Sequence, residues 1–499
     1  MRYFKLIIVA LTLYTSAASA QWSIDSLSTP YNGLTVTQNG SKAIFANATK
    51  YELYDFTNNA WTTYNMAVPR SNVKAATANG KSYFGGGGFI GLYSYNFFNN
   101  VEIYNASGST WTTAKLSTAR IVGNAVAIGN KVMFAGGRQI LNYSNRVDIF
   151  DVTTGVRTTH NLSQPRTNMA VAVVGTKVIF AGGETGNIPN GVYTSSNKVD
   201  IYDDATGIWS TALISVKREQ IAVAVAGNKV LFAGGITPSG LYSNRIDIYD
   251  AAANTWSTKN MSQTKYGIAT ATAGDKIYLA GGTINNSGAL SNRVEIYNAT
   301  TNTLSYVTLS SPRMSMAVAQ TAKRIMFAGG VVTWGNVGTD RIEVLDLATN
   351  VWSVEYLSRP RLNLASASYG NKAMFAGGAE VLSGYPQYTI LSKRVDIWTD
   401  LQPRFLSPAA STPSNESSIT VYPNPAIGNF INVELKQFED DEVCIQITNM
   451  NGDILRNQII NNFSNSTAQI DIANLNAGAY YVTVKSKNKN VSSSFVVHQ

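Results

Sequence analysis

The chain has 499 residues, of which 44% are hydrophobic and 14% are charged, so it is long enough for more than one globular domain. It contains one cysteine, Cys444, and two histidines, His160 and His498. This composition excludes an intrachain disulfide and leaves little imidazole for metal binding or base catalysis. The formal net charge is +9, and residues 401–499 hold six Lys or Arg against eight Asp or Glu, so the excess positive charge lies before residue 401.

The first twenty residues have the features of a secretory signal peptide. Arg2 and Lys5 flank the apolar run LIIVALTLY, and the small residues ASA end at Ala20 as they do at a cleavage site. The apolar run is too short to span a bilayer, and no later stretch predicts a transmembrane segment. We therefore expect an exported protein whose mature chain begins at Gln21.

Residues 21–400 consist of a unit that repeats with a period of about 48 residues. An apolar strand followed by two glycines recurs as SYFGGG (82–87), VMFAGG (132–137), VIFAGG (178–183), VLFAGG (230–235), IYLAGG (277–282), IMFAGG (325–330) and AMFAGG (373–378). An Ala-rich strand precedes it, and two strands such as KVDIYD (198–203) and WSTALIS (209–215) follow it. Four short strands per unit, separated by turn residues, predict one blade of a β-propeller.

The third strand of the unit occurs eight times, which predicts eight blades. The first unit, 29–66, is weak because AIFANA replaces the diglycine, and without it the ring would have seven blades. The last unit lacks its fourth strand, whereas WSIDSLS at 22–28 copies WSTKNMS at 256–262. We expect the N-terminal strand to complete the last blade, because ring closure removes the free edges of a sheet.

Three features of the unit resemble kelch-repeat propellers. They are the diglycine after an apolar strand, the tyrosine in VDIYD, and a tryptophan six residues after Asp or Asn, as in Asp250 and Trp256 or Asp346 and Trp352. The resemblance covers about residues 22–400. It implies an all-β fold in which residues 21–400 form a kelch-type β-propeller.

The C-terminal part differs in composition and pattern. Residues 401–418 are rich in Pro, Ser, Ala and Thr, as in a linker, and residues 419–499 alternate like the short strands of a small β-sandwich. YPNP at Tyr422–Pro425, NMNGDIL at 449–455 and LNAGAYYVTV at 475–484 resemble the type A C-terminal sorting domain of the type IX secretion system. The resemblance implies a bacterium of the Bacteroidota, contact with the type IX machinery, and secretion or outer-membrane surface localisation. A carbohydrate-binding or stalk sandwich is the alternative.

Two columns of the repeat carry cations. The inner cations precede the first strand of each unit and are Arg70, Arg120, Arg166, Arg218, Lys265, Arg313 and Arg361. The outer cations precede the third strand and are Lys50, Arg146, Lys198, Arg245, Arg293, Arg341 and Arg394. Antiparallel strand directions put both columns on one face, where two rings of positive charge would attract anions.

Each column also has a structural interpretation. An outer cation and the acid two residues later, such as Arg146 and Asp148, share one face of a strand and could form ion pairs locally or between blades. The inner cations either form a ligand-binding rim or brace the backbone at blade junctions. Glu219, which directly follows Arg218, is either half of a local salt bridge or a functional carboxylate at the same candidate rim.

The sequence favours a secreted or surface binding module that recognises a glycan or a protein ligand at a cationic axial face. The alternative is a sugar-active enzyme, similar to a sialic acid epimerase or a carboxylate-based lyase or hydrolase, in which Glu219 would stand near the axis. A third possibility is a structural surface protein without a ligand. No catalytic motif, metal site or cofactor site is predicted. Nucleic acid is a poor partner, because the protein is exported and its cations are dispersed in rings.

Overall fold

The computed structural model describes residues 21–90, 95–333, 337–382, 385–400, 419–436, 438, 442–449, 454–461, 467–486 and 490–498. They divide into two compact units, one within Ala20–Asp400 and one within Leu401–Gln499. The signal peptide predicted at 1–20 and the linker predicted at 401–418 lie outside the described residues. In the described part of the chain, no helix has the length and apolar character needed to cross a membrane.

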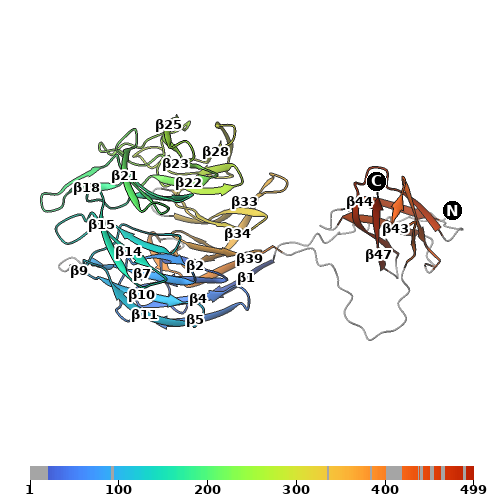
Figure 1. The fold of residues 1–499 in the computed structure, drawn as a ribbon, viewed down its shortest axis with the longest axis horizontal. Helices are drawn as coiled ribbons and strands as arrows, with labels where there is room; N and C mark the ends of the chain where they lie inside the picture. Colours follow the sequence, from blue (N-terminus) through green and yellow to red (C-terminus); the bar gives the residue numbers. More distant parts are fainter. Residues whose placement is uncertain are drawn as a thin grey trace, which may run out of the picture. The chain divides into compact units, whose positions relative to one another are not determined.

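The first unit is a propeller of eight antiparallel sheets, as the eight copies of the third strand predict (Figure 1). From the inner to the outer edge, blade 1 contains β2 (Thr35–Asn39), β3 (Lys42–Ala46), β4 (Lys50–Asp55) and β5 (Ala60–Asn65). Blade 2 contains β6 (Lys74–Ala78), β7 (Lys81–Gly85), β10 (Asn100–Asn105) and β11 (Thr110–Lys115). Blade 3 contains β12 (Asn124–Ile128), β13 (Lys131–Ala135), β14 (Arg146–Asp151) and β15 (Arg157–Asn161). Blade 4 contains β16 (Ala170–Val174), β17 (Lys177–Ala181), β20 (Lys198–Asp203) and β21 (Ile208–Leu213).

The remaining blades repeat this order. Blade 5 contains β22 (Ala222–Ala226), β23 (Lys229–Ala233), β24 (Arg245–Asp250) and β25 (Thr255–Asn260). Blade 6 contains β26 (Ala269–Ala273), β27 (Lys276–Ala280), β28 (Arg293–Asn298) and β29 (Thr303–Thr308). Blade 7 contains β30 (Ala317–Gln320), β31 (Arg324–Ala328), β33 (Val337–Asp346) and β34 (Trp352–Arg361). Blade 8 contains β35 (Ala365–Tyr369), β36 (Lys372–Ala376), β39 (Arg394–Thr399) and β1 (Gln21–Ser26).

The N-terminal strand closes the ring, as predicted. β1 pairs antiparallel with β39, so that Trp22 lies opposite Trp398 and their rings meet edge to face with centroids 5.0 Å apart. The inner strands contact one another in the order β2, β6, β12, β16, β22, β26, β30 and β35, and β35 contacts β2 again. The alternating alanines of these strands, such as Ala170 and Ala172, are buried where the blades converge.

The diglycine is needed because two blades meet there. In blade 3, Gly136 and Gly137 have φ angles of +60° and +115°. A Cβ on Gly136 would lie 2.4 Å from the carbonyl oxygen of Arg166, which belongs to blade 4, and the Gly137 N–H donates to that oxygen at 2.8 Å. Any side chain here would push the neighbouring blades apart. Blade 1 instead has Asn47, whose side chain accepts hydrogen bonds from the N–H groups of Thr49 and Lys50 and closes a short turn.

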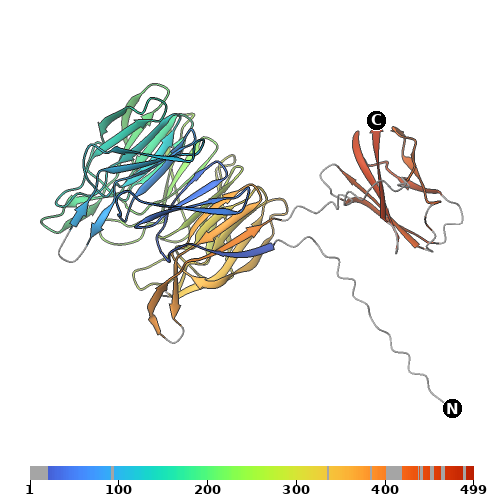
Figure 2. The ribbon, with the colours of Figure 1, turned by 90° about the horizontal axis from the view of Figure 1, so that it is seen from below.

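Short hairpins extend the connections between the second and third strands of several blades. They are β8 (Gly88–Ile90) with β9 (Tyr95–Phe97), β18 (Glu184–Asn187) with β19 (Val192–Ser195), and β37 (Ala379–Leu382) with β38 (Tyr385–Leu391). In blade 7, β32 (Val331–Thr333) pairs with the start of the long β33. Figure 2 shows the β8–β9 and β37–β38 hairpins projecting from the same side of the propeller.

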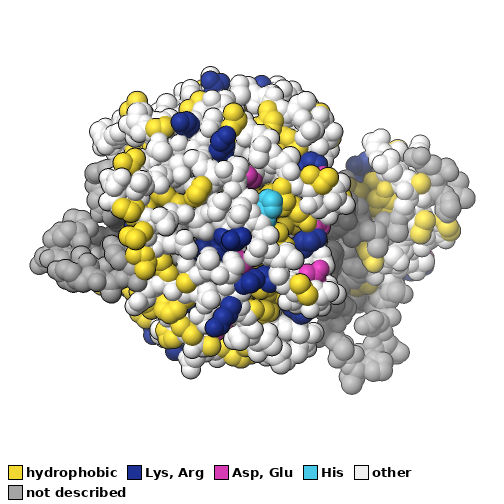
Figure 3. Space-filling model, turned by 60° about the vertical axis from the view of Figure 1, so that its left-hand side comes forward, with side chains coloured by type: hydrophobic (Ala, Val, Ile, Leu, Met, Phe, Trp, Pro, Cys, Tyr) yellow, Lys and Arg dark blue, Asp and Glu magenta, His cyan; other side chains and the backbone are white. Residues whose placement is uncertain are grey.

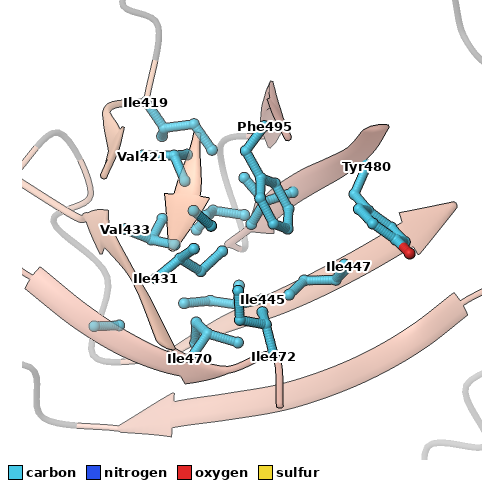
Figure 4. Close-up of a cluster of buried hydrophobic side chains, with 14 of the residues drawn as sticks. Ile419, Val421, Ile431, Val433, Ile445, Ile447, Ile470, Ile472, Tyr480 and Phe495 are labelled. Atoms are coloured by element: carbon cyan, nitrogen blue, oxygen red, sulfur yellow. The ribbon is translucent and has the colours of Figure 1, made fainter. Parts of the chain in front are cut away.

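The second unit is a small β-sandwich, as predicted. One sheet contains β40 (Val421–Tyr422), β42 (Phe430–Glu434) and β45 (Thr467–Asp471). The other contains β41 (Ala426–Ile427), β47 (Asn490–His498), β46 (Gly478–Lys485), β43 (Glu442–Asn449) and β44 (Ile454–Asn461). Aliphatic side chains from the two sheets, among them Ile431, Ile445 and Ile470, meet in one buried core together with Phe495 (Figure 4).

Candidate functional site

All the candidate residues lie on one face of the propeller. Because every blade is antiparallel, the connections between second and third strands open on the same face as those that lead from the fourth strand to the next blade. We call this side the connection face. It carries the inner cations, the outer cations and Glu219, as the sequence predicts.

The inner cations are not exposed on this face. All seven have 0% exposed surface. Arg120 is typical, because its Nη2 lies 2.8 Å from the Asp148 carboxylate and its Nε donates to the Gly136 carbonyl oxygen at 2.9 Å. Burial lowers the pKa of Arg120, and the charge of Asp148 opposes this effect. The guanidinium therefore acts as an internal link between strands of its own blade.

The same ion pair recurs around the ring. The pairs are Arg70–Glu102, Arg120–Asp148, Arg166–Asp200, Arg218–Asp247, Arg313–Glu343 and Arg361–Asp396. In blade 6, Lys265 reaches only the Arg293 carbonyl oxygen, at 3.1 Å, and burial lowers its pKa to about 8 despite the charge of Glu295. The predicted pairing of Arg146 with Asp148 is therefore wrong, because the third-strand acids turn inward to the inner cations.

Each of these acids also holds the connection that enters its blade. Asp148 accepts the backbone N–H of Ser117 at 2.7 Å, and Ser117 lies on the connection from blade 2. An equivalent bond occurs in all eight blades, with the acceptors Glu52, Glu102, Asp148, Asp200, Asp247, Glu295, Glu343 and Asp396. The cation, the acid and the connection form a unit that we call the junction staple.

The burial of the inner cations decides between their two interpretations. A side chain without exposed surface contributes no rim to the connection face, so these residues brace the blade junctions. Figure 3 brings forward the side on which β9 and β18 lie, and its Lys and Arg side chains are scattered in small separate groups. The inner of the two expected rings of exposed positive charge is therefore absent from the described residues, whereas the outer cations are half-buried or exposed.

Three residues per blade form a further layer above the junction staples. The first residue directly follows the inner cation. The second directly follows the diglycine and pairs with the first through its backbone. The third lies on the segment that leads back to the third strand of the blade, and it pairs with the second. We call this layer the collar. In blades 2 to 8 its members are Ser71, Gly88, Phe97; Ile121, Arg138, Tyr143; Thr167, Glu184, Ser195; Glu219, Ile236, Tyr242; Tyr266, Thr283, Leu290; Met314, Val331, Gly338; and Leu362, Ala379, Leu391.

The polar side chains of the collar gather on blades 3 to 5. The hydroxyl of Tyr143, on blade 3, donates a hydrogen bond to Glu184 Oε1 on blade 4. Asn168 Nδ2 donates to the other carboxylate oxygen of Glu184 at 3.3 Å. Glu219, on blade 5, lies beside the same carboxyl group. Three adjacent blades therefore contribute to one cluster. We call Glu184 and Glu219 the carboxylate pair, and Tyr143 and Asn168 are its hydrogen-bond donors.

Glu219 differs electrostatically from a surface carboxylate. Partial burial, the charge of Glu184 and a hydrogen bond between the two side chains raise the pKa of Glu219 to about 7. Two ionised carboxylates have no hydrogen to share, so this contact needs one proton between them. Among the described residues no cation forms an ion pair with Glu219, and its Oε2 has no hydrogen-bond partner. The local salt bridge considered for Glu219 is therefore not formed.

The rest of the collar is asymmetric. Next to the carboxylate pair, Tyr242 of blade 5 and Tyr266 of blade 6 pack together with ring centroids 4.9 Å apart. On the other side of the ring, Val331, Leu362 and Ala379 form a small buried apolar cluster. The collar thus has a polar and aromatic part on blades 3 to 6 and an apolar part on blades 7 and 8.

Sequence reasoning identified Glu219 but missed Tyr143, Glu184 and Asn168. A usable signal was present for Glu184, because it follows the diglycine of its unit and is the only acid among the residues at that position. Tyr143 could not be found in this way, since its partner lies on another blade, and Asn168 could not, since it lies 16 residues before its partner and outside the repeated strand pattern.

Two open hollows lie elsewhere on the connection face. One of about 480 Å³ includes Asp25, Glu380 and Arg394 in its lining, at blade 8. The other, of about 650 Å³, lies between blades 2 and 3. Within the described residues, no group of three or more His, Cys, Asp or Glu side chains is placed to hold a metal ion.

Comparison with known families agrees with both units. Residues 168–378 match the KLHDC2/KLHL20/DRC7 Kelch-repeats domain, and residues 420–498 match the secretion system C-terminal sorting domain. No curated protein matches the chain. The sorting domain implies interaction with the type IX export machinery and secretion or display at the outer-membrane surface. The protein is therefore a kelch-repeat β-propeller protein that carries a C-terminal type IX sorting domain.

Proposed function

We propose that the protein is a secreted or cell-surface binding module that recognises a glycan at the polar part of its collar. The observation that carries this proposal is the cluster of Tyr143, Glu184 and Glu219, which three adjacent blades hold together. Small-molecule sites combine a few converging polar groups with aromatic surface. Tyr242 and Tyr266 supply such surface beside the cluster.

Unsatisfied polar atoms support ligand binding at this place. Glu219 Oε2 and Arg138 Nε are both buried without a hydrogen-bond partner among the described residues. Arg138 pairs with Tyr143 through its backbone on blade 3, whereas Glu219 pairs with Ile236 on blade 5. A buried polar group without a partner is unfavourable, and separate hydroxyls of one ligand can donate to Glu219 and accept from Arg138.

The ligand class follows from the charges of the cluster. Two carboxyl groups with at most one shared proton favour a neutral, hydroxyl-rich ligand over an anionic one. This changes the sequence-based hypothesis, in which exposed cations would have attracted an anion. A protein loop could donate similar hydrogen bonds, but two packed tyrosines beside carboxyl groups suit the alternating apolar and hydroxyl faces of a sugar ring.

The sugar-active enzyme remains a second candidate because the raised pKa of Glu219 suits a general acid. The electrostatics favour binding over hydrolysis, however. Glycosidases place their two carboxyl groups about 5 Å or more apart so that the scissile bond fits between them. The hydrogen bond that contributes to the raised pKa of Glu219 ties this group to Glu184 rather than to a substrate.

A neutral glycan array, followed by calorimetric titration of the hits, tests the proposal with the full-length chain. We expect Glu219→Gln to weaken binding at least tenfold. Met314→Gln is the matched control, since Met314 holds the equivalent collar position on blade 7. Absence of binding to the array at both low and high salt would support a structural protein without a ligand.

Product analysis separates binding from catalysis. Proton NMR of each bound glycan, incubated with the protein, should show no new resonances. Conversion that Glu219→Gln abolishes and Met314→Gln preserves would establish the enzyme instead.

A further inference from the structure

The lining of the hollow of about 650 Å³ includes the turn that joins two collar residues of blade 3, Arg138 and Tyr143. Its wall on one side is the turn from Gln139 to Asn142, in which the Gln139 N–H donates to the Asn142 carbonyl oxygen at 2.8 Å. Arg138 precedes this turn and Tyr143 follows it. The hollow and the carboxylate pair therefore share one structural element, because the residue after the turn donates its hydroxyl to Glu184.

The lining of the hollow combines carboxamides with apolar surface. Asn96, Gln139 and Asn142 provide amides, while Phe97, Phe98 and Leu141 provide aromatic and aliphatic surface. No charged residue is among the lining residues. Ile140 and Leu141 are adjacent in this lining and are 51% and 58% exposed, so together they present contiguous apolar surface. The volume falls within the range of about 300–1,000 Å³ found for ligand pockets.

We propose that this hollow is a second subsite for uncharged sugar units of a glycan chain whose neighbouring unit lies at the carboxylate pair. Amide side chains donate to and accept from hydroxyls, and aromatic rings cover the apolar face of a sugar. The inference rests on the proposed function, and it adds that the ligand is a neutral chain of several sugar units.

A saccharide fits the hollow better than a peptide strand does. An extended peptide usually adds to a free sheet edge through its backbone groups. Here the N–H of Gln139 is already used within the turn, and the N–H of Phe98 donates to the Gly87 carbonyl oxygen at 3.0 Å. The available partners in the wall are therefore side-chain amides.

The test compares a long and a short probe on the full-length protein. The probes are cellohexaose, xylohexaose and mannohexaose, each beside its disaccharide, in calorimetric titrations. Leu141→Arg places a long cation in the hollow. The matched control is Ile390→Arg, because Ile390 is 47% exposed on the equivalent connection of blade 8 and does not line the hollow. Thermal unfolding checks that each variant is folded.

We expect Leu141→Arg to weaken the binding affinity for the hexasaccharide at least tenfold and to leave the affinity for its disaccharide unchanged. Only the longer chain would reach both subsites. Glu219→Gln should weaken the binding of both probes, and Ile390→Arg should weaken the binding of neither.

The alternative results separate the two proposals. If Glu219→Gln loses binding while Leu141→Arg binds like the unchanged protein, the second subsite is wrong and the proposed function stands. Equal weakening of both probes by Leu141→Arg would mean a single site and also overturn the inference. If no probe binds the unchanged protein, or if only peptides compete for the hollow, the saccharide class is wrong for both proposals.

Discussion

Glu219 is distinguished from the other collar residues by a strongly raised pKa, which burial and the neighbouring Glu184 carboxyl group cause. Its pKa rises from 4.5 to about 7 on folding. Between these values the folded state holds more protons than the unfolded state, so this group lowers the free energy of unfolding as pH rises from 4.5 to about 7.

Glu219→Gln should remove this pH dependence. We expect the variant to be about 1 kcal/mol more stable than the unchanged protein at about pH 8, after allowance for solvent screening, and equally stable near pH 4. Urea denaturation across this range measures the difference. Glu355→Gln, on the outer strand β34, is the charge-matched control, and a Glu219→Gln difference that stays constant with pH would contradict the prediction.

Lys265 is the only lysine among the inner cations, and burial lowers its pKa from 10.5 to about 8. Between these values the unfolded state holds more protons, so this lysine raises the free energy of unfolding with pH in that window. Arginine stays protonated and offers a fork of donors to Glu295.

Lys265→Arg should therefore stabilise the protein by ~1–2 kcal/mol at neutral pH and abolish the rise above about pH 8. Chemical denaturation at several pH values checks this, with the exposed Lys217→Arg as control. Parallel pH curves for Lys265→Arg and the unchanged protein would count against the assigned role of Lys265.

The sequence shows the inner cations but not their burial. Their acids lie far along the chain, 28 residues from Arg120 and 35 residues from Arg361. For the same acids, the outer cation two residues earlier in the chain was the more obvious partner. Only the fold decides between them, because the third strand turns its acid toward the entrance of the same blade.

At the scale of elements, the junction staple links three segments in each of the six blades that have the ion pair. Asp148 has no exposed surface and joins Arg120 to the Ser117 connection. Removing one partner of such a pair leaves the other charge buried without compensation, which costs ~3–5 kcal/mol.

A double-mutant cycle tests the staple. We expect Asp148→Asn and Arg120→Met each to destabilise by ~3 kcal/mol or more, and the double variant to lose clearly less than the sum, because neither charge is then left alone. Thermal and urea unfolding measure the cycle. Additive losses would show that the two side chains act independently.

The elements themselves were largely predictable. Apolar strands, diglycines and turn residues recur with a regular period, so the strands of each blade could be placed from the sequence. The collar could not, since it is built from single residues after those signals and from returning chains of different length. Blade 1 illustrates this difference, because Asn47 replaces the diglycine and closes a short turn there.

At the scale of the whole molecule, ring closure depends on β1. Deleting Gln21–Ser26 would leave the edge of β39 unpaired and remove the contact between Trp22 and Trp398. We expect a loss of ~3 kcal/mol or more and concentration-dependent association through the exposed edge. Unfolding curves and size-exclusion chromatography check this. Trp22→Phe, which keeps the strand, is the control. If the deletion variant is a monomer of unchanged stability, the proposed role of β1 in ring closure is contradicted.

Net charge was a poor guide to the site. The sequence predicts a basic propeller, yet folding buries the seven inner cations beside acids and leaves two carboxyl groups in the collar. Counting charges shows how many there are, whereas their exposure depends on contacts between blades that lie far apart in the chain.

The most direct test of the central claim is a crystal structure of the protein with a bound neutral oligosaccharide. Electron density for the sugar should lie on the connection face, over blades 3 to 5, in contact with Glu219. Density over the apolar part of the collar, on the opposite face or at the outer strands would contradict it.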